Sequence, residues 1–166
     1  MSHPHTASRG FALRPATPAD VPDLVRLICA LAEYEKLTHL LEITPEALQA
    51  QLFGARPPAE ALVAQLDDGR VVGFALFFTN FSTFLCKPGL YLEDLFVEPA
   101  HRGLGIGRAL MQALAGLAVE RGYGRFEWCV LDWNEPAIRF YESLGASILP
   151  DWRLCRVTGS AMERIA

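Results

Sequence analysis

A glycine-rich turn lies between an apolar segment and an amphipathic helical pattern near the middle of the chain. Most residues of Leu90–Val97 are apolar or aromatic, and after the turn an apolar stripe recurs at helical spacing. Three glycines in five positions let the backbone turn its N–H groups toward one point at a helix N-terminus, where unpaired amides and the helix dipole attract an anion. The segment therefore predicts a phosphate or pyrophosphate cradle. Its residues are Arg102, Gly103, Leu104, Gly105, Ile106, Gly107 and Arg108.

The spacing of these glycines excludes two common nucleotide-binding motifs. A dinucleotide fingerprint requires Gly-x-Gly-x-x-Gly, but Arg108 or Leu110 stands where its last glycine belongs. A Walker loop requires lysine at the position of Arg108. Glu127 lies about twenty residues past the turn, where an acid could contact a ribose, but its alternating surroundings are typical of a strand residue facing solvent.

The composition describes a globular chain of single-domain length. The chain has 166 residues, of which 51% are hydrophobic and 10% aromatic, and its formal net charge is −4. A negative charge argues against non-specific nucleic-acid binding and is compatible with a cationic substrate. No apolar run approaches the roughly 20 residues of a membrane span, and the first residues lack a secretory signal, so we expect a cytoplasmic protein without membrane contact.

The cysteines and histidines form no metal-binding pattern. The four cysteines are widely spaced and include no Cys-x-x-Cys pair. We therefore expect reduced, mostly packed thiols and no metal site, rather than a disulfide framework or a zinc site.

Alternating and helical patterns predict one α/β domain, a mixed sheet flanked by helices, over residues 11–166, preceded by a flexible tail over 1–10. Strands are predicted over residues 11–14, 61–66, 71–79, 90–97, 126–131 and 153–157, with a loop over 80–89. Helices are predicted to begin at Thr17, at Thr44 and at the glycine turn, and a further helix runs from Asn134 to Leu144. Pro18 in the first turn and Asp20 at the third position support the helix start at Thr17.

A series of short motifs resembles the GNAT superfamily of N-acetyltransferases. Arg102, Gly105 and Gly107 match its acyl-CoA motif, Arg-x-x-Gly-x-Gly, and the likeness extends from Phe11 to Met162. It is greatest to the branch that contains the spermidine/spermine (diamine) and thialysine acetyltransferases. The shared stretches are LRPAT at 13–17, AEYE at 32–35, YLED at 91–94, LDWN at 131–134, FY at 140–141 and LGA at 144–146. The resemblance implies a GNAT-like, mostly antiparallel sheet, acetyl-CoA as cosubstrate and a homodimer.

Acetyl transfer to an amine makes three chemical demands. The amine, with a pKa of roughly 10, must lose a proton, the thioester oxygen gains negative charge during attack, and the departing thiolate, with a parent pKa of about 8.5, must be stabilised or protonated. The resemblance implies that Tyr141 gives the thiolate its proton and that Glu93 receives the amine proton through water. From the residues alone, Tyr141 fits a packed helix aromatic better.

The adjacent acids Glu93 and Asp94 pose a geometric question. Neighbouring strand residues point to opposite faces of a sheet, so both can serve one site only if a bulge intervenes. Otherwise one of the two is solvated or pairs with an arginine. The resemblance favours Glu93 at the substrate.

The resemblance also implies where the two substrates bind. Backbone groups of Leu95, Phe96 and Val97 would hold the pantetheine arm and polarise the acetyl oxygen, with Asn134 and Ala137 near the coenzyme from the other side. The amine would contact Tyr34, Glu35, Glu93, Asp132 and Trp133. As an alternative, Glu35 with Glu33 fits an ordinary solvated helix end.

One departure from the diamine-acetylating relatives narrows the substrate. Those relatives carry a longer acidic insertion where this chain has only Ser-Ile-Leu-Pro-Asp at 147–151. The short segment favours a lysine-like amino acid such as thialysine, or a short diamine, over a long polyamine. Two alternatives remain open: a peptide or protein N-acetyltransferase, and a non-catalytic acyl-CoA sensor. Tyr141 and Glu93 argue against the sensor, because binding alone needs only the glycine turn.

Overall fold

The computed structural model describes residues 10–166, which fall into two compact units, one ending at Cys129 and one running from Val130 to Ala166. Each unit is described by itself below. The prediction of a flexible tail lies almost wholly outside the described residues, and the prediction of a single domain over 11–166 stays a prediction.

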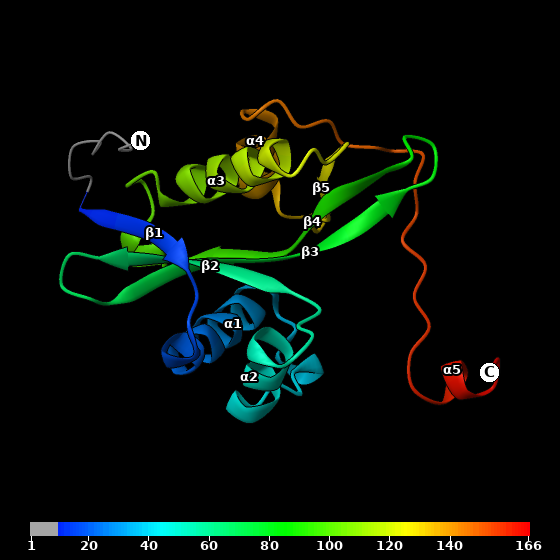
Figure 1. Ribbon diagram of the computed structural model, residues 1–166, viewed down its shortest axis with the longest axis horizontal. Coiled ribbons are helices and arrows are strands. Elements are labelled where there is room, and N and C mark those ends of the chain that lie inside the picture. Colours follow the sequence, from blue (N-terminus) through cyan, green and yellow to red (C-terminus); the bar gives the residue numbers. More distant parts are fainter. Residues whose placement is uncertain (1–9) are drawn as a thin grey trace. The chain divides into compact units, whose positions relative to one another are not determined.

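The first unit is built on a five-stranded sheet in the order β1-β2-β3-β4-β5 (Figure 1). Neighbouring strands pair antiparallel except β4 and β5, which are parallel, so the predicted mixed, mostly antiparallel sheet is confirmed. The strands are β1 Phe11–Pro15, β2 Glu60–Leu66, β3 Val71–Ser82, β4 Lys87–Val97 and β5 Phe126–Trp128.

Helices cover both faces of this sheet (Figure 1). On one face, α1 (Val21–Glu35) and α2 (Pro45–Phe53) form a core with Phe74 and Phe96 from the sheet. The other face carries α3 (Ile106–Glu120), whose residues Ile106, Leu110, Met111, Leu114 and Ala118 are buried. Three short 3₁₀ turns complete the unit: η1 Pro18–Asp20, η2 Thr38–Leu40 and η3 Pro99–His101.

The predicted start of the first helix is confirmed, although η1 precedes α1. The Asp20 carboxylate accepts hydrogen bonds from the backbone N–H of Thr17 at 2.7 Å and from its hydroxyl at 2.9 Å. It also accepts two from the Arg14 guanidinium, both at 2.7 Å. These donors, with Arg14 contributing most, hold the pKa of the buried Asp20 carboxyl down at about 2. The first strand and the first helix are therefore joined by one carboxylate.

The prediction of a loop over residues 80–89 is wrong. The β3–β4 ladder continues through Asn80 opposite Gly89 to Ser82 opposite Lys87, so only residues 83–86 form the turn. The polar residues and glycine there suggested a loop, but ladder hydrogen bonds satisfy their backbone groups whatever the side chains. The Ser82 hydroxyl closes the turn by accepting a hydrogen bond from the backbone N–H of Leu85 at 3.2 Å.

The second unit contains α4 (Glu135–Glu142) and the short α5 (Ser160–Glu163). Helix α4 ends two residues before the predicted Leu144. The predicted strand over 153–157 is wrong, because these residues are exposed and have no strand partner within residues 10–166. Alternation with arginines suggested a strand, but alternation alone supplies no neighbouring strand. Likewise, β5 ends at Trp128, three residues before the predicted end.

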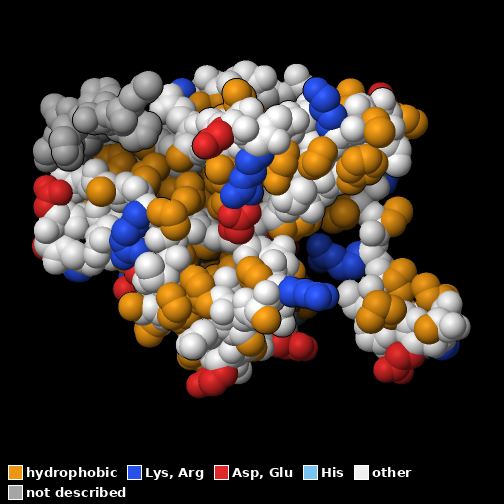
Figure 2. Space-filling model, in the orientation of Figure 1, with side chains coloured by type: hydrophobic (Ala, Val, Ile, Leu, Met, Phe, Trp, Pro, Cys, Tyr) orange, Lys and Arg blue, Asp and Glu red, His pale blue; other side chains and the backbone are white. Residues whose placement is uncertain are grey.

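The chemistry of the surface is mixed. On the face of the described residues that Figure 2 shows, acidic and basic side chains are interspersed among apolar ones.

The cysteines are free, but Cys86, Cys129 and Cys155 are exposed and Cys29 is half-buried, so the expectation of mostly packed thiols is wrong. Among the helices of residues 10–166, none combines the length and the apolar character that crossing a membrane requires.

Candidate active site

A β-bulge lies at Glu93, in the middle of β4. Asp94 is opposite Leu76 and Leu92 is opposite Phe77, so Glu93 is the extra residue of β4 and has no partner on β3. Cross-strand partners share a face, and Leu76 and Phe77 point to opposite faces. Asp94 therefore turns away from the face of Leu92 and toward that of Phe96. The sequence left this possibility open, and the bulge decides it.

The bulge places the two acids within electrostatic reach of the end of α1. Burial, the charge of Glu93 and the charge of Glu35 together raise the pKa of Asp94 to about 6. Burial also raises the pKa of Glu35, which is half-buried in the last turn of α1. Glu93 itself is exposed. The charges of Glu93 and Glu35 thus both act on Asp94, and a cation bound near Asp94 would relieve that repulsion.

Tyr34 belongs to the same end of α1, and the positively charged side chain of Arg102 packs against its ring. The guanidinium of Arg102 lies 5.0 Å from the centre of the Tyr34 ring and 5.6 Å from that of Phe96. Its Nε donates a hydrogen bond to the backbone oxygen of Val97 at 3.0 Å. Arg102, predicted as a phosphate ligand, therefore lies against an aromatic residue predicted to contact the amine.

The part of β4 that follows the bulge has a strand neighbour on one side only. Leu95, Phe96 and Val97 pair with β3, whereas β5 pairs with β4 only over Leu90–Leu92. Within the described residues, the other edge of β4 thus has no strand partner beyond Leu92. An extended ligand arm can hydrogen-bond to such an edge as an added strand does. The residues predicted to hold the pantetheine arm stand on this edge.

The glycine turn follows the same strand and opens directly into α3. Gly103 and Gly105 both have φ of +83°, and Gly105 is the residue that caps the helix. A Cβ at either position would meet no atom of the described structure within 4 Å, so the left-handed backbone, not crowding, is what requires glycine. Leu104 is exposed and Ile106 is buried as the first residue of α3. Gly107 and Arg108 lie in the first turn of α3, whose N–H groups can bind an anion.

The remaining predicted site residues lie in the second unit. The buried side chain of Asn134 caps α4 by accepting a hydrogen bond from the backbone N–H of Ala137 at 3.3 Å. Tyr141 lies in α4, is 9% exposed, and stacks at a tilt with Phe140, their ring centres 5.3 Å apart. Asp132 and Trp133 are exposed in the segment before α4.

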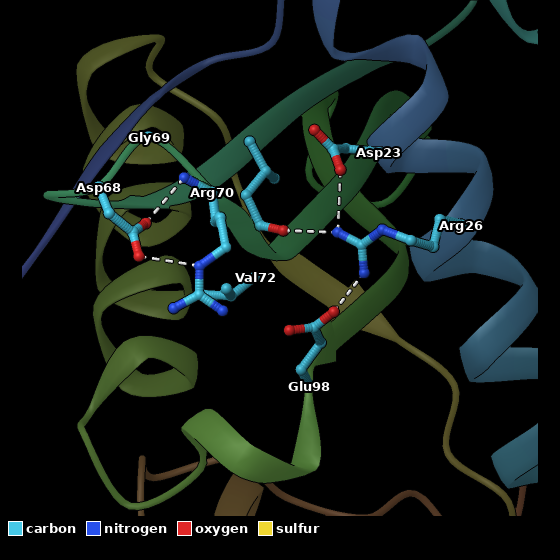
Figure 3. Close-up of a pocket in the computed structure, with 8 residues that line it drawn as sticks. Asp23, Arg26, Asp68, Gly69, Arg70, Val72 and Glu98 are labelled. Atoms are coloured by element: carbon cyan, nitrogen blue, oxygen red, sulfur yellow. Dashed lines mark hydrogen bonds and ion pairs between the residues drawn. The ribbon is translucent and has the colours of Figure 1, made fainter.

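A polar cavity of about 590 Å³ opens elsewhere in the first unit, between the start of α1, the β2–β3 turn and the end of β4 (Figure 3). None of the predicted site residues lines it. Arg26 donates hydrogen bonds there to Glu98, to Asp23 at 2.9 Å and to the backbone oxygen of Val71 at 2.8 Å. Arg70 pairs with Asp68 at 2.9 Å. The arginines that line this cavity are thus paired with acids that also line it. The cavity is therefore not the candidate active site.

Sequence reasoning undervalued two residues of the site. The resemblance favours Glu93 over Asp94, and a regular strand would let only one of the two acids serve a given site; the bulge removes that restriction. The contact of Arg102 with Tyr34 joins residues remote in the chain, and no local pattern signals it. By contrast, Glu127 forms an ion pair with Arg125 at 2.7 Å and accepts a hydrogen bond from Asn80 at 3.0 Å, in keeping with a strand residue. Within residues 10–166, no cluster of three or more His, Cys, Asp or Glu side chains is arranged to hold a metal.

The sequence and the fold of this chain are similar to those of known proteins. The profile of the Acetyltransferase (GNAT) family matches residues 26–146. L-Ornithine N5-acetyltransferase of Arabidopsis thaliana is 38% identical, with 96% of this chain and 90% of that protein covered. Thialysine N-epsilon-acetyltransferase of Mus musculus is also 38% identical, with 93% and 96% covered. Among solved structures, an integron cassette protein from the mobile metagenome of V. cholerae superimposes with a TM-score of 0.78 at 26% identity, over 94% of this chain and 97% of that one.

Proposed function

The chain belongs to the GNAT family of acetyltransferases and is an acyltransferase; on that premise we propose that it transfers acetyl from acetyl-CoA directly to a primary amine of a small cationic substrate. One observation carries the proposal. The bulge in β4 places Asp94, on which the charges of Glu93 and Glu35 act, at one end of a strand edge, and the glycine turn follows the other end after the short turn η3. This edge of β4, which can bind an extended ligand arm, thereby connects a site for a cation near Asp94 with a site for an anion at the glycine turn.

In this proposal the coenzyme lies along β4. The diphosphate binds the N–H groups of the 102–108 turn, where the α3 dipole favours negative charge. The pantetheine arm follows the edge at Leu95–Val97, which spans roughly 10 Å at about 3.3 Å per residue. Backbone N–H groups of the same edge polarise the acetyl oxygen and stabilise its charge during attack. Asn134 and Ala137 are proposed as further coenzyme contacts.

The amine is held by the acids near Tyr34. A primary amine with a pKa of roughly 10 arrives as a cation at neutral pH, and three carboxylates attract it. Glu93, the exposed member of the group, accepts a proton from the ammonium through water, which frees the nitrogen lone pair. Asp132 and Trp133 are proposed to contact the rest of the substrate.

The transfer then proceeds in one displacement at the acetyl carbonyl carbon. The neutral nitrogen forms the new C–N bond, the C–S bond breaks, and the electron pair of that bond leaves on sulfur. Tyr141 gives its hydroxyl proton to the thiolate, which restores the neutral thiol of CoA. The phenolate regains a proton from solvent, and the extra proton of the acetylated nitrogen leaves to water.

Within this class of amines we favour thialysine, ornithine or a lysine-like amino acid over a long polyamine. Two relatives that match nearly the whole chain act, by their names, on ornithine and thialysine. The short 147–151 segment with its single acid Asp151 is a further reason. A homodimer is proposed from the resemblance.

The test is acetyl-CoA turnover, followed as release of free thiol, with thialysine, lysine, ornithine, putrescine, spermidine, spermine and a lysine-containing peptide. We expect turnover of one or two small amines well above hydrolysis. Turnover of the peptide alone would favour a peptide or protein acetyltransferase. Binding of acetyl-CoA without turnover of any amine would contradict the proposal and favour an acyl-CoA sensor.

A further inference from the structure

Arg102 connects the two halves of the proposed site. It is the first residue of the glycine turn in sequence, yet its guanidinium lies over the rings of Tyr34 and Phe96. A hydrogen bond from Nε to the backbone oxygen of Val97 holds its stem at the end of β4. Arg102 is exposed, so its terminal nitrogens can change partners without unpacking the core.

The Tyr34 ring is a favourable place for a cation. The negative face of an aromatic ring attracts guanidinium and ammonium groups alike, most strongly within about 6 Å of its centre. Glu35 follows Tyr34 in the last turn of α1, and its negative charge, with that of Glu93, acts on Asp94. Phe96 is only 4% exposed, whereas Tyr34 is 38% exposed, so the tyrosine offers the accessible face.

The Arg102 guanidinium and the ammonium group of the substrate therefore compete for the face of the Tyr34 ring. A protonated amine drawn to the three carboxylates meets the Tyr34 face, and the chain's own Arg102 already covers it. A diphosphate bound at the glycine turn offers Arg102 stronger, charge-assisted partners than an aromatic ring does. Binding of the coenzyme would thus draw the guanidinium away from the Tyr34 ring, and the face of the ring would become accessible to the substrate.

We propose that the face of Tyr34 is a cation site occupied in turn by Arg102 and by the ammonium group of the substrate, so that coenzyme binding opens the amine site. The inference rests on the proposed function. Because binding linkage is reciprocal, the amine must raise the affinity for the coenzyme by the same factor. The ring attracts positive charge rather than a particular hydrogen-bond donor. An analogue with a quaternary ammonium should therefore still bind this face, whereas an analogue with a neutral group in its place should not.

The test is equilibrium binding by calorimetry of the best amine from the turnover panel. The amine is titrated into the free protein and into protein saturated with CoA, which lacks the acetyl group and permits no reaction. We expect CoA to lower the Kd of the amine about tenfold, within the usual range of coupling between sites. Absence of coupling in the unchanged protein overturns the inference.

Three variants separate this mechanism from general attraction between an anionic coenzyme and a cationic amine. In Arg102→Gln, we expect the free protein to bind the amine several-fold more tightly, with coupling to CoA below twofold. Lys36→Gln is the matched control, because it removes a positive charge next to Glu35 without removing a ring contact. It should keep the tenfold coupling. Equal coupling in Arg102→Gln and Lys36→Gln would refute the role of Arg102.

Tyr34→Leu gives an independent measurement on the coenzyme side. Arg102 then has no Tyr34 ring to leave, so CoA should bind several-fold more tightly than to the unchanged protein, while the amine binds more weakly. An unchanged or weaker affinity for CoA contradicts the inference. Since turnover is measured separately, a protein that acetylates amines without Arg102-dependent coupling refutes this inference and leaves the proposed function standing.

Discussion

The pKa of Asp94, in the bulge of β4, is raised to about 6 by burial, by the charge of Glu93 and by that of Glu35 in the last turn of α1. The two carboxyl groups come from elements far apart in the chain, and only the extra residue at Glu93 turns Asp94 toward the α1 face. Like charges held together at a partly buried place cost stability unless a cation joins them. Such a site is prepared for a cationic ligand.

Asp94→Asn should therefore stabilise the folded protein at neutral pH. The raised pKa means that the native state holds this proton more tightly than the unfolded chain, so the stability of the unchanged protein falls as the pH rises from about 4 to about 6. The substitution removes that loss and should raise the free energy of unfolding by about 1–2 kcal/mol at pH 7. Urea unfolding at several pH values measures it. The gain should shrink toward pH 4, and a loss of stability at pH 7 would count against the acid cluster.

The same carboxyl should make amine binding depend on pH. A group with a pKa of about 6 goes from roughly one-tenth ionised at pH 5 to nine-tenths at pH 7, while an amine with a pKa of roughly 10 stays protonated throughout. The Kd of the amine should therefore fall several-fold over this interval in the unchanged protein. Calorimetry at pH 5, 6 and 7 tests this, and Asp94→Asn should flatten the profile. An identical profile in the variant would exclude Asp94 from the amine site.

Tyr141→Phe should lower kcat by about 10²-fold or more with little change in the affinity for acetyl-CoA, because it removes the proposed donor to the thiolate and keeps the ring. Thiol release and coenzyme titration give the two numbers. Tyr123→Phe is the matched control, since it removes a tyrosine hydroxyl that bonds the Thr79 hydroxyl at 2.9 Å and has no proposed role. A kcat equal in both variants would argue that Tyr141 only packs.

Gly105→Ala should weaken coenzyme binding and destabilise the fold. The left-handed backbone at φ +83° costs a residue with a Cβ about 1–2 kcal/mol, and relief of that strain would move the N–H groups of the turn. Gly116→Ala, in the interior of α3, meets no atom within 4 Å and has no positive φ, so it should stabilise the helix by about 0.5–1 kcal/mol. Thermal unfolding and CoA titration compare the two. Equal effects of both changes would show that the turn does not need its left-handed residue.

Asp20→Asn should destabilise the protein by about 2–4 kcal/mol at pH 7, because it leaves Arg14 and the Thr17 amide without their charged acceptor. A carboxyl whose pKa is lowered to about 2 contributes stability that is present above its ordinary pKa and is lost as the pH falls through 2. The difference between the variant and the unchanged protein should accordingly narrow in acid. Asp68→Asn, at an exposed pair with Arg70, should cost less than about 1 kcal/mol.

Much of this protein followed from local sequence. The helix start at Thr17, the second helix and the glycine turn before α3 were all predicted, because caps, turns and helical stripes depend on residues within a few positions of one another. The family motif added the expected roles of Tyr141 and Glu93. The predictions of a loop over 80–89 and of a strand over 153–157 failed, because a strand depends on pairing with another strand that a local pattern does not reveal.

The sequence by itself determined the glycine turn, the family and the set of acids available for an amine site. Only the tertiary structure decided where these acids lie. Pairing of β4 with β3 placed the bulge at Glu93, turned Asp94 toward Glu35 and left one edge of β4 without a strand partner beyond Leu92 within the described residues. It also laid Arg102 over Tyr34. Strand register and contacts between remote residues come from the packing of the whole sheet against its helices, and no short stretch of sequence contains that information.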